Sequence, residues 1–108
     1  PKHYGRIIRA DDEVIAIREF RDCTPDEQLI LEINSGVYCF DIAYLLFALQ
    51  KLTTNNDQHE YYLTDTLEIL RSAGQNIKAL KTNNPEEIAG INTIEELNEA
   101  EKVMYVKI

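Results

Sequence analysis

Near the start of the chain, two short apolar runs separated by polar residues predict a β-hairpin. Two β-rich runs, residues 6–9 and 14–19, flank an acidic turn at residues 11–13. Such runs on either side of a turn are typical of paired antiparallel strands. The apolar positions that line the faces of the hairpin are Ile7, Val14, Ile15 and Ile17.

Two helices are predicted next by their end signals and their apolar spacing. A short helix follows Thr24 as N-cap and Pro25 as first residue, and it ends near Leu31. A second helix, within residues 41–52, starts at Asp41. Its inner face is predicted to carry Tyr44, Leu45, Ala48, Leu49 and Leu52.

Two further helices are predicted in the second half of the chain. One spans residues 61–74, with leucines at helical spacing and Gly74 as its stop. The other closes the chain after Thr93, with Glu96 three residues on in a capping-box pattern. Residues 83–92 between them are predicted to form a loop or a single helical turn.

Residues 32–41, EINSGVYCFD, are predicted to form a strand that is buried on both faces. Asn34, Ser35 and Gly36 stand in its middle, although polar residues and glycine weaken a central strand. Either the strand has a bulge there, or the polar residues hold a ligand at close range. A fourth strand is predicted at residues 76–82.

The resulting order, β-β-α-β-α-α-β-α, predicts an α/β protein with a mixed sheet flanked by helices. Four short strands are few for such a sheet, so its remaining strands are expected elsewhere. The chain also opens without an initiator Met and stops inside an apolar run. We therefore expect a piece of a longer protein.

Charge and composition narrow the possible partners. The chain has 108 residues, of which 44% are hydrophobic, and its net charge is −8. An acidic surface argues against binding of nucleic acid or anionic membrane. No apolar run approaches the roughly 20 residues of a membrane span, and the two cysteines show no metal-ligand spacing. We expect a cytoplasmic protein.

Several residues could carry binding chemistry, and each also has a structural explanation. Gly5 could admit a ligand to the main chain or serve as a strand entry. Glu19 could accept a sugar hydroxyl or form a surface ion pair. The Asn34 amide suits sugar hydroxyls, but it could also be satisfied within the fold. Asn92 could offer Mg²⁺ an oxygen ligand or lie in a loop.

Four segments in order, YGRIIR, EINSGVYCFD, NNDQHEYYLTD and GINTIEELNEAE, together resemble one family. They are similar to the C-terminal half of the sugar-1-phosphate nucleotidyltransferase domain. The bacterial bifunctional UDP-N-acetylglucosamine pyrophosphorylase/glucosamine-1-phosphate N-acetyltransferases are the members that the motifs match most closely. The resemblance extends over essentially the whole chain, residues 1–108.

This resemblance implies a partial Rossmann-like nucleotidyltransferase fold and a role in forming UDP-N-acetylglucosamine and pyrophosphate from UTP and N-acetylglucosamine-1-phosphate. It implies that Gly5, Glu19 and Asn34 bind the nucleotide-sugar and that Asn92 is a Mg²⁺ ligand. Tyr62 and Thr64 are implied to lie beside the acetamido sugar. On this interpretation Asn34 and Gly36 interrupt the strand because the sugar lies over it.

Departures from the family pattern leave alternatives open. Ser35 replaces a common Thr, and His59 stands where Gly is frequent. The Gly-rich N-terminal half, the aspartate that joins Asn92 on the metal, and the C-terminal β-helix for acetyl transfer and homotrimer assembly are absent. We therefore expect no catalytic residue and no catalysis in this piece alone. Another hexose-1-phosphate nucleotidyltransferase, or a non-catalytic regulatory or assembly subunit, remains an alternative.

Overall fold

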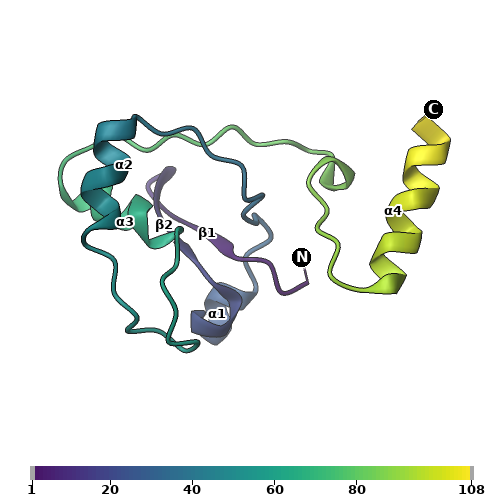
Figure 1. Cartoon of the computed structure of the whole chain (residues 1–108), viewed down its shortest axis with the longest axis horizontal. Helices are drawn as coiled ribbons and strands as arrows, with labels where there is room; N and C mark the ends of the chain where they lie inside the picture. The colour runs from purple at the N-terminus through teal and green to yellow at the C-terminus, as the bar shows by residue number, and fades with distance from the viewer. Residues whose placement is uncertain (1, 108) are drawn as a thin grey trace.

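The computed structural model describes residues 2–107 of the chain, with side-chain surroundings through residue 104. A two-stranded antiparallel sheet and four α-helices make up its regular structure (Figure 1). The strands are β1 (Arg6–Ala10) and β2 (Glu13–Arg18), and the helices are α1 (Pro25–Gln28), α2 (Ile42–Leu49), α3 (Asp65–Ser72) and α4 (Ile94–Lys107). Short 3₁₀ turns lie at Phe20–Asp22 and Pro85–Glu87.

The predicted hairpin is confirmed. β1 and β2 pair in antiparallel register, with Arg6 opposite Arg18 and Ala10 opposite Glu13. Asp11 and Asp12 form the turn with φ of 51° and 67°. Aspartate tolerates this left-handed conformation better than most residues do, which explains why an acidic pair connects the strands.

The helix starts predicted at Thr24 and Asp41 are confirmed by the hydrogen bonds of their caps, whereas the helix predicted over residues 61–74 begins only at Asp65. The Thr24 hydroxyl accepts from the Glu27 N–H at 3.2 Å, while the Glu27 carboxylate accepts from the Thr24 N–H at 2.8 Å. The Asp41 carboxylate accepts from the Ala43 N–H at 3.0 Å. These bonds satisfy N–H groups that have no partner inside the first turn of a helix. α1 is nevertheless shorter than predicted, since it ends at Gln28.

The strand predicted over residues 32–41 is wrong. Only Ile33 pairs, in an isolated antiparallel bridge to Arg6. Beyond it the described chain runs as an irregular segment, and Val37 is exposed rather than buried.

Local hydrogen bonds explain why this strand ends. The Asn34 side-chain oxygen accepts from the Gly36 N–H at 3.1 Å, and the Ser35 hydroxyl accepts from the Val37 N–H at 3.1 Å. Gly36 has φ of 81°, a conformation that a residue with a Cβ rarely adopts. Side chains therefore take the donors that a ladder would use, and the backbone turns.

The strand predicted at residues 76–82 is also wrong, because no strand is found there among the described residues. Leu80 is fully exposed in this segment. An isolated strand has no hydrogen-bonding partner, so an apolar run without a neighbouring strand stays irregular. The described residues form an α/β arrangement with a small antiparallel sheet, and a mixed sheet is not seen in them.

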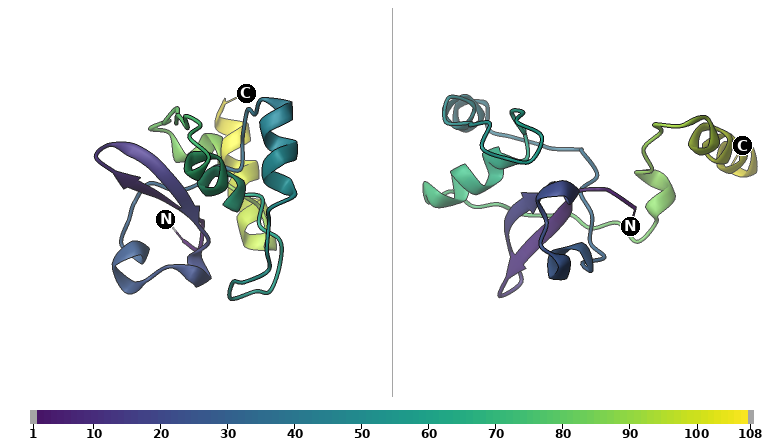
Figure 2. Two further views of the ribbon diagram at one scale, coloured as in Figure 1. Left: turned by 90° about the vertical axis from the view of Figure 1, so that its left-hand side faces the viewer. Right: turned by 90° about the horizontal axis from the view of Figure 1, so that it is seen from below.

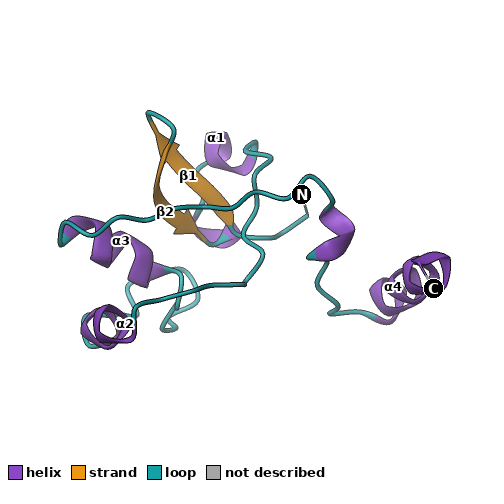
Figure 3. Cartoon of the chain, turned by 90° about the horizontal axis from the view of Figure 1, so that it is seen from above, coloured by secondary structure: helices purple, strands orange, loops and turns teal. Residues whose placement is uncertain are grey.

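The helices pack around the hairpin unevenly. α3 packs against β2, α2 packs against α3, and α1 lies beside β1 (Figures 1 and 2). Figure 3 shows α4 apart from these elements, beyond the 3₁₀ turn at Pro85–Glu87. None of the helices within the described residues is both long enough and apolar enough to cross a membrane.

The core lies around α3, which packs against β2 on one side and α2 on the other. Its buried side chains on β2 are Val14, Ala16 and Ile17, with Ala48 from α2 and Leu70 from α3. The inward face predicted for α2 is only partly confirmed. Ala48 is buried, whereas Tyr44 and Leu49 are exposed at 45% and 40%.

Candidate functional site

Three of the predicted site residues meet at one end of the hairpin. The Asn34 N–H donates to the Gly5 carbonyl at 2.8 Å, which sets Asn34 against the free edge of β1. On the other side, β2 ends at Arg18, immediately before Glu19. The position of a Cβ on Gly5 lies 3.4 Å from the Arg18 carbonyl oxygen and 3.6 Å from the Asn34 Cβ. Gly5 therefore lies between the end of β2 and the segment that carries Asn34.

Packing does not explain a glycine at position 5. A Cβ there would be 3.4 Å from Ile17 Cγ2, and its other neighbours are no nearer. These are the distances of ordinary van der Waals contact. Gly5 is nevertheless buried, and the place of its missing side chain is lined by these neighbouring atoms rather than open.

The Asn34 amide is oriented by its neighbours. Its Oδ1 accepts from the Gly36 N–H and, at 2.9 Å, from the Tyr38 hydroxyl. Burial raises the pKa of Tyr38, so this hydroxyl stays a donor at neutral pH. Both partners are donors, which identifies the atom that faces them as the oxygen. The amide nitrogen of Asn34 has no acceptor among the described residues. It is therefore the atom of this side chain that can donate to a ligand.

Glu19 is held by Thr64 from across the fold. The Thr64 hydroxyl donates to Glu19 Oε1 at 3.1 Å, and Thr64 itself is 5% exposed. Thr64 stands at the N-cap of α3. Because α3 packs against β2, the helix fixes this hydroxyl beside the end of the strand.

Glu19 and Tyr62 share a cleft of about 270 Å³. Asp22 and Asp65 also line it, together with Asn55, Asn56, Ile17 and Arg18. The Tyr62 hydroxyl and Asp22 Oδ2 are buried, and neither has a hydrogen-bond partner among the described residues. Buried polar atoms without partners are costly in a folded chain. Asp22 and Gln58 lie close enough to the Tyr62 hydroxyl to affect its pKa, so these polar groups are neighbours in the cleft, available to one another and to a ligand that forms hydrogen bonds.

The electrostatics of this cleft select the kind of ligand. Burial, followed by the nearby carboxylates of Glu68, Asp22 and Glu19, raises the pKa of Asp65. Such a shift arises where carboxylates crowd one another away from water. The cleft therefore favours neutral hydroxyl groups or a cation and disfavours a phosphate.

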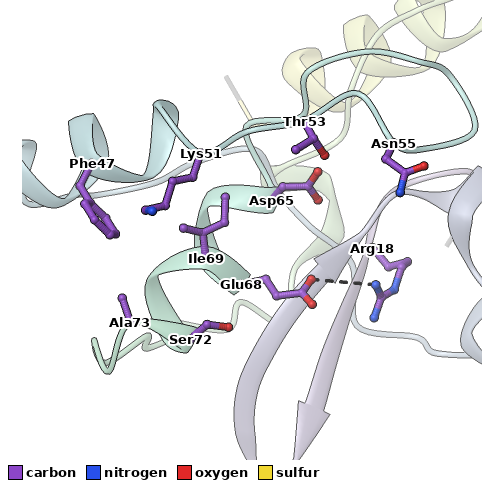
Figure 4. Close-up of a pocket in the computed structure, with 10 residues that line it drawn as sticks. All are labelled: Arg18, Phe47, Lys51, Thr53, Asn55, Asp65, Glu68, Ile69, Ser72 and Ala73. Atoms are coloured by element: carbon purple, nitrogen blue, oxygen red, sulfur yellow. Dashed lines mark ion pairs between the residues drawn. The ribbon is translucent and has the colours of Figure 1, made fainter.

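A second, larger cleft of about 660 Å³ lies between α2, α3 and the end of β2 (Figure 4). Arg18 and Glu68 form an ion pair at 4.0 Å within it, and Phe47 and Lys51 line its far side. None of the six predicted site residues lines this cleft. We assign the candidate site to the smaller cleft and the adjoining edge of β1 because the polar side chains converge there.

Asn92 lies apart from the other candidates, at the start of α4. It is exposed, and its N–H donates to the Glu96 carboxylate at 3.1 Å. The described part of the chain holds no group of three or more His, Cys, Asp or Glu residues placed to bind a metal. The Asn92 amide oxygen fits Mg²⁺ as a single ligand, since this ion retains water and takes few protein ligands.

An ion pair fixes the segment that carries Asn34. Arg9 Nε lies 2.6 Å from Glu32 Oε1, and Arg9 Nη2 donates to Glu32 Oε2 at 2.8 Å, so the pair is bidentate. The hydrogen bonds to Arg9 lower the pKa of Glu32. With the Ile7 N–H donating to the Glu32 carbonyl at 3.0 Å, they hold this segment on β1.

We expect Glu32→Gln to lower the melting temperature at pH 7 and to lose this effect in acid. A carboxyl whose pKa is lowered by folding stabilises the protein above the pKa of the unfolded state, about 4.3. That contribution disappears as the pH falls through the lower pKa of the folded state. Melting curves of both proteins from pH 7 to pH 3 should therefore converge at the acid end. A constant difference across this range would contradict the role of Glu32.

Several residues of this site were not among the sequence predictions, and Tyr38 and Asp22 are two of them. Tyr38 lies within the strand predicted over residues 32–41, yet its hydroxyl orients Asn34. Asp22 follows β2 in a 3₁₀ turn and lines the smaller cleft. No local sequence pattern identifies either residue, because tertiary packing and not a motif places them at the site.

Comparison with known proteins relates the whole chain to one group of relatives. The chain is 49% identical over 108 residues to a bifunctional protein GlmU of Clostridium botulinum. It is 50% identical over 109 residues to the protein of this name from Clostridium novyi, and 50% over 108 residues to that from Clostridium beijerinckii. Each alignment covers 100% of this chain and 24% of the relative. No family model matches the chain.

The chain thus spans about a quarter of the length of the curated relatives it matches. The bifunctional name of these relatives agrees with the family that the four motifs resemble. The resemblance is therefore confirmed, in that this chain is similar over its full length to a segment of GlmU proteins.

Proposed function

We propose that this GlmU-like chain is the sugar-binding part of an N-acetylglucosamine-1-phosphate uridylyltransferase. The parent protein would form UDP-N-acetylglucosamine and pyrophosphate from UTP and N-acetylglucosamine-1-phosphate. The observation that carries this proposal is the identity of about 50% to GlmU proteins over the entire chain. A Rossmann-like domain, completed by segments outside these residues, is part of the proposal.

The geometry of the candidate site supports the sugar as the bound group. The Asn34 amide nitrogen would donate to a sugar or acetamido oxygen, and Glu19 would accept from a sugar hydroxyl. Gly5 would contribute its main chain between these two residues. Tyr62 would line the acidic cleft, and Thr64 would orient the Glu19 carboxylate. An acidic cleft suits a neutral ring, and the phosphates would lie outside it.

Asn92 would supply one oxygen ligand to Mg²⁺, and its other protein ligand would come from outside this chain. When bound, the metal ion would neutralise negative charge on the phosphate groups during transfer. This chain would contribute chiefly by positioning the attacking sugar phosphate. It contains no Gly-rich phosphate loop, which is consistent with binding rather than catalysis.

The proposal is tested by assaying the full-length protein with UTP, Mg²⁺ and N-acetylglucosamine-1-phosphate. We expect release of pyrophosphate and formation of UDP-N-acetylglucosamine, and no turnover by the 108-residue chain alone. Glucose-1-phosphate and glucosamine-1-phosphate serve as matched alternative substrates. Equal or better turnover of either would contradict the assigned sugar. No turnover by the full-length protein with any of them would support a regulatory or assembly subunit.

A further inference from the structure

A hydrogen bond joins the start of the chain to the loop before α4, beside the candidate site. The Tyr4 hydroxyl accepts from the Gly90 N–H at 2.7 Å, across 86 positions of sequence. Tyr4 directly precedes Gly5, and Gly90 lies two residues before Asn92. In Figures 1 and 3 the first described residues of the chain lie beside the segment that leads into α4. This contact therefore links the proposed sugar-binding edge to the loop that carries Asn92.

The approach at Gly90 is close. A Cβ at this position would lie 3.3 Å from the Tyr4 hydroxyl oxygen and 3.5 Å from Tyr4 Cε1. A side chain at position 90 would crowd the Tyr4 ring. Glycine at this position therefore permits the hydrogen bond between Gly90 and Tyr4. A second link lies beyond Asn92, where Lys2 Nζ is 3.3 Å from the Glu96 carboxylate.

The rest of this loop contributes little to holding itself in place. Residues 88–92 are exposed or half-buried, and none is buried. Segments with few buried contacts open more easily than the core does. A single short hydrogen bond to a half-buried tyrosine is therefore a large share of what fixes the loop.

We propose that Tyr4 is a positioning residue that holds the 88–92 loop against the Gly5 edge and so completes the nucleotide-sugar site. This inference rests on the proposed function, because it concerns the same site. The proposal implies that the ordering of the loop and the binding of the nucleotide-sugar are coupled. Ordering the loop lowers the entropy lost when a nucleotide-sugar binds, and the bound sugar in turn protects the loop.

The test compares Tyr4→Phe with the wild type in the full-length protein. Phenylalanine keeps the ring and removes only the oxygen that accepts from Gly90. We expect the Gly90 amide to exchange at least about tenfold faster, and the dissociation constant of UDP-N-acetylglucosamine to rise about fivefold to tenfold, from the loss of one hydrogen bond. Amide exchange is measured with and without UDP-N-acetylglucosamine, and its protection of Gly90 by the ligand should be lost.

Two further variants sharpen the test. Tyr61→Phe removes a hydroxyl from an exposed tyrosine, 71% accessible, and should change neither exchange nor affinity. Gly90→Ala should weaken binding like Tyr4→Phe, and the double variant should be no worse than either, because all three disrupt one contact. Additive losses would contradict a shared contact.

The two proposals fail in different ways. If the wild type does not bind UDP-N-acetylglucosamine, the proposed function is overturned. If it binds, but Tyr4→Phe leaves both the affinity and the exchange of the Gly90 amide unchanged, the role of Tyr4 is overturned while the proposed function stands.

Discussion

We expect Arg6→Ala to lower the free energy of unfolding by about 3 kcal/mol, through lost hydrogen bonds and a cavity. Arg6 is 2% exposed, although it carries a charge. Its guanidinium donates to three main-chain carbonyls, those of Lys2, Tyr4 and Gln28. These carbonyls would lose their donor in the variant. Urea unfolding of the chain, followed by circular dichroism, measures the difference.

Arg6 is held by main-chain oxygens and by an aromatic ring rather than by a carboxylate. Its guanidinium carbon lies 5.3 Å from the centroid of the Phe20 ring, where a cation is attracted to the ring face. Arg6→Lys keeps the charge but loses the planar guanidinium and its several N–H donors. We therefore expect this variant to be less stable than the wild type as well. Arg21→Ala, at an exposed arginine, is the matched control and should change stability by less than about 0.5 kcal/mol. Equal effects of Arg6→Ala and Arg21→Ala would contradict this account.

The second large effect is expected from Asn34→Asp in the full-length protein. A carboxylate keeps the oxygen that accepts from Gly36 and Tyr38, so the turn should persist. It replaces the free amide donor with a second acceptor and adds charge to an acidic edge. We expect the dissociation constant of UDP-N-acetylglucosamine to rise about tenfold to a hundredfold, as for one lost and unreplaced hydrogen bond. Titration calorimetry provides the measurement.

Stability separates this explanation from a structural one. Asn34→Asp should melt close to the wild type, whereas Asn34→Ala should lose both affinity and stability because it removes the turn-forming oxygen. Asn76→Asp makes the same change of charge at an exposed position and serves as the control. An affinity for UDP-N-acetylglucosamine that survives Asn34→Asp would remove Asn34 from the proposed site.

Sequence patterns predicted the elements that form from local interactions. The two β-rich runs around the acidic turn predicted the hairpin, and Thr24 and Asp41 predicted helix starts within one residue. Gly74 adopts φ of 87° at the end of α3, as a stop signal requires. Each of these features depends on neighbours within a few residues, so a short window of sequence contains the whole cause.

The two predicted strands that are absent show the limit of such patterns. Residues 32–41 and 76–82 have the apolar content of strands, but a strand forms only with a partner. At the first of them, Asn34 and Gly36 favour a turn instead. The apolar content of a segment indicates that its side chains favour burial. It does not indicate which other part of the protein packs against that segment.

The sequence alone also provided the family resemblance and six candidate residues, since motifs in order are a property of the sequence. Only the tertiary structure determined which residues meet. The packing of α3 on β2 brings Thr64 to Glu19, the bridge beside β1 brings Asn34 to Gly5, and Tyr4 reaches Gly90 across the fold. Contacts between residues far apart in the chain depend on how whole elements pack, and no local pattern records that packing.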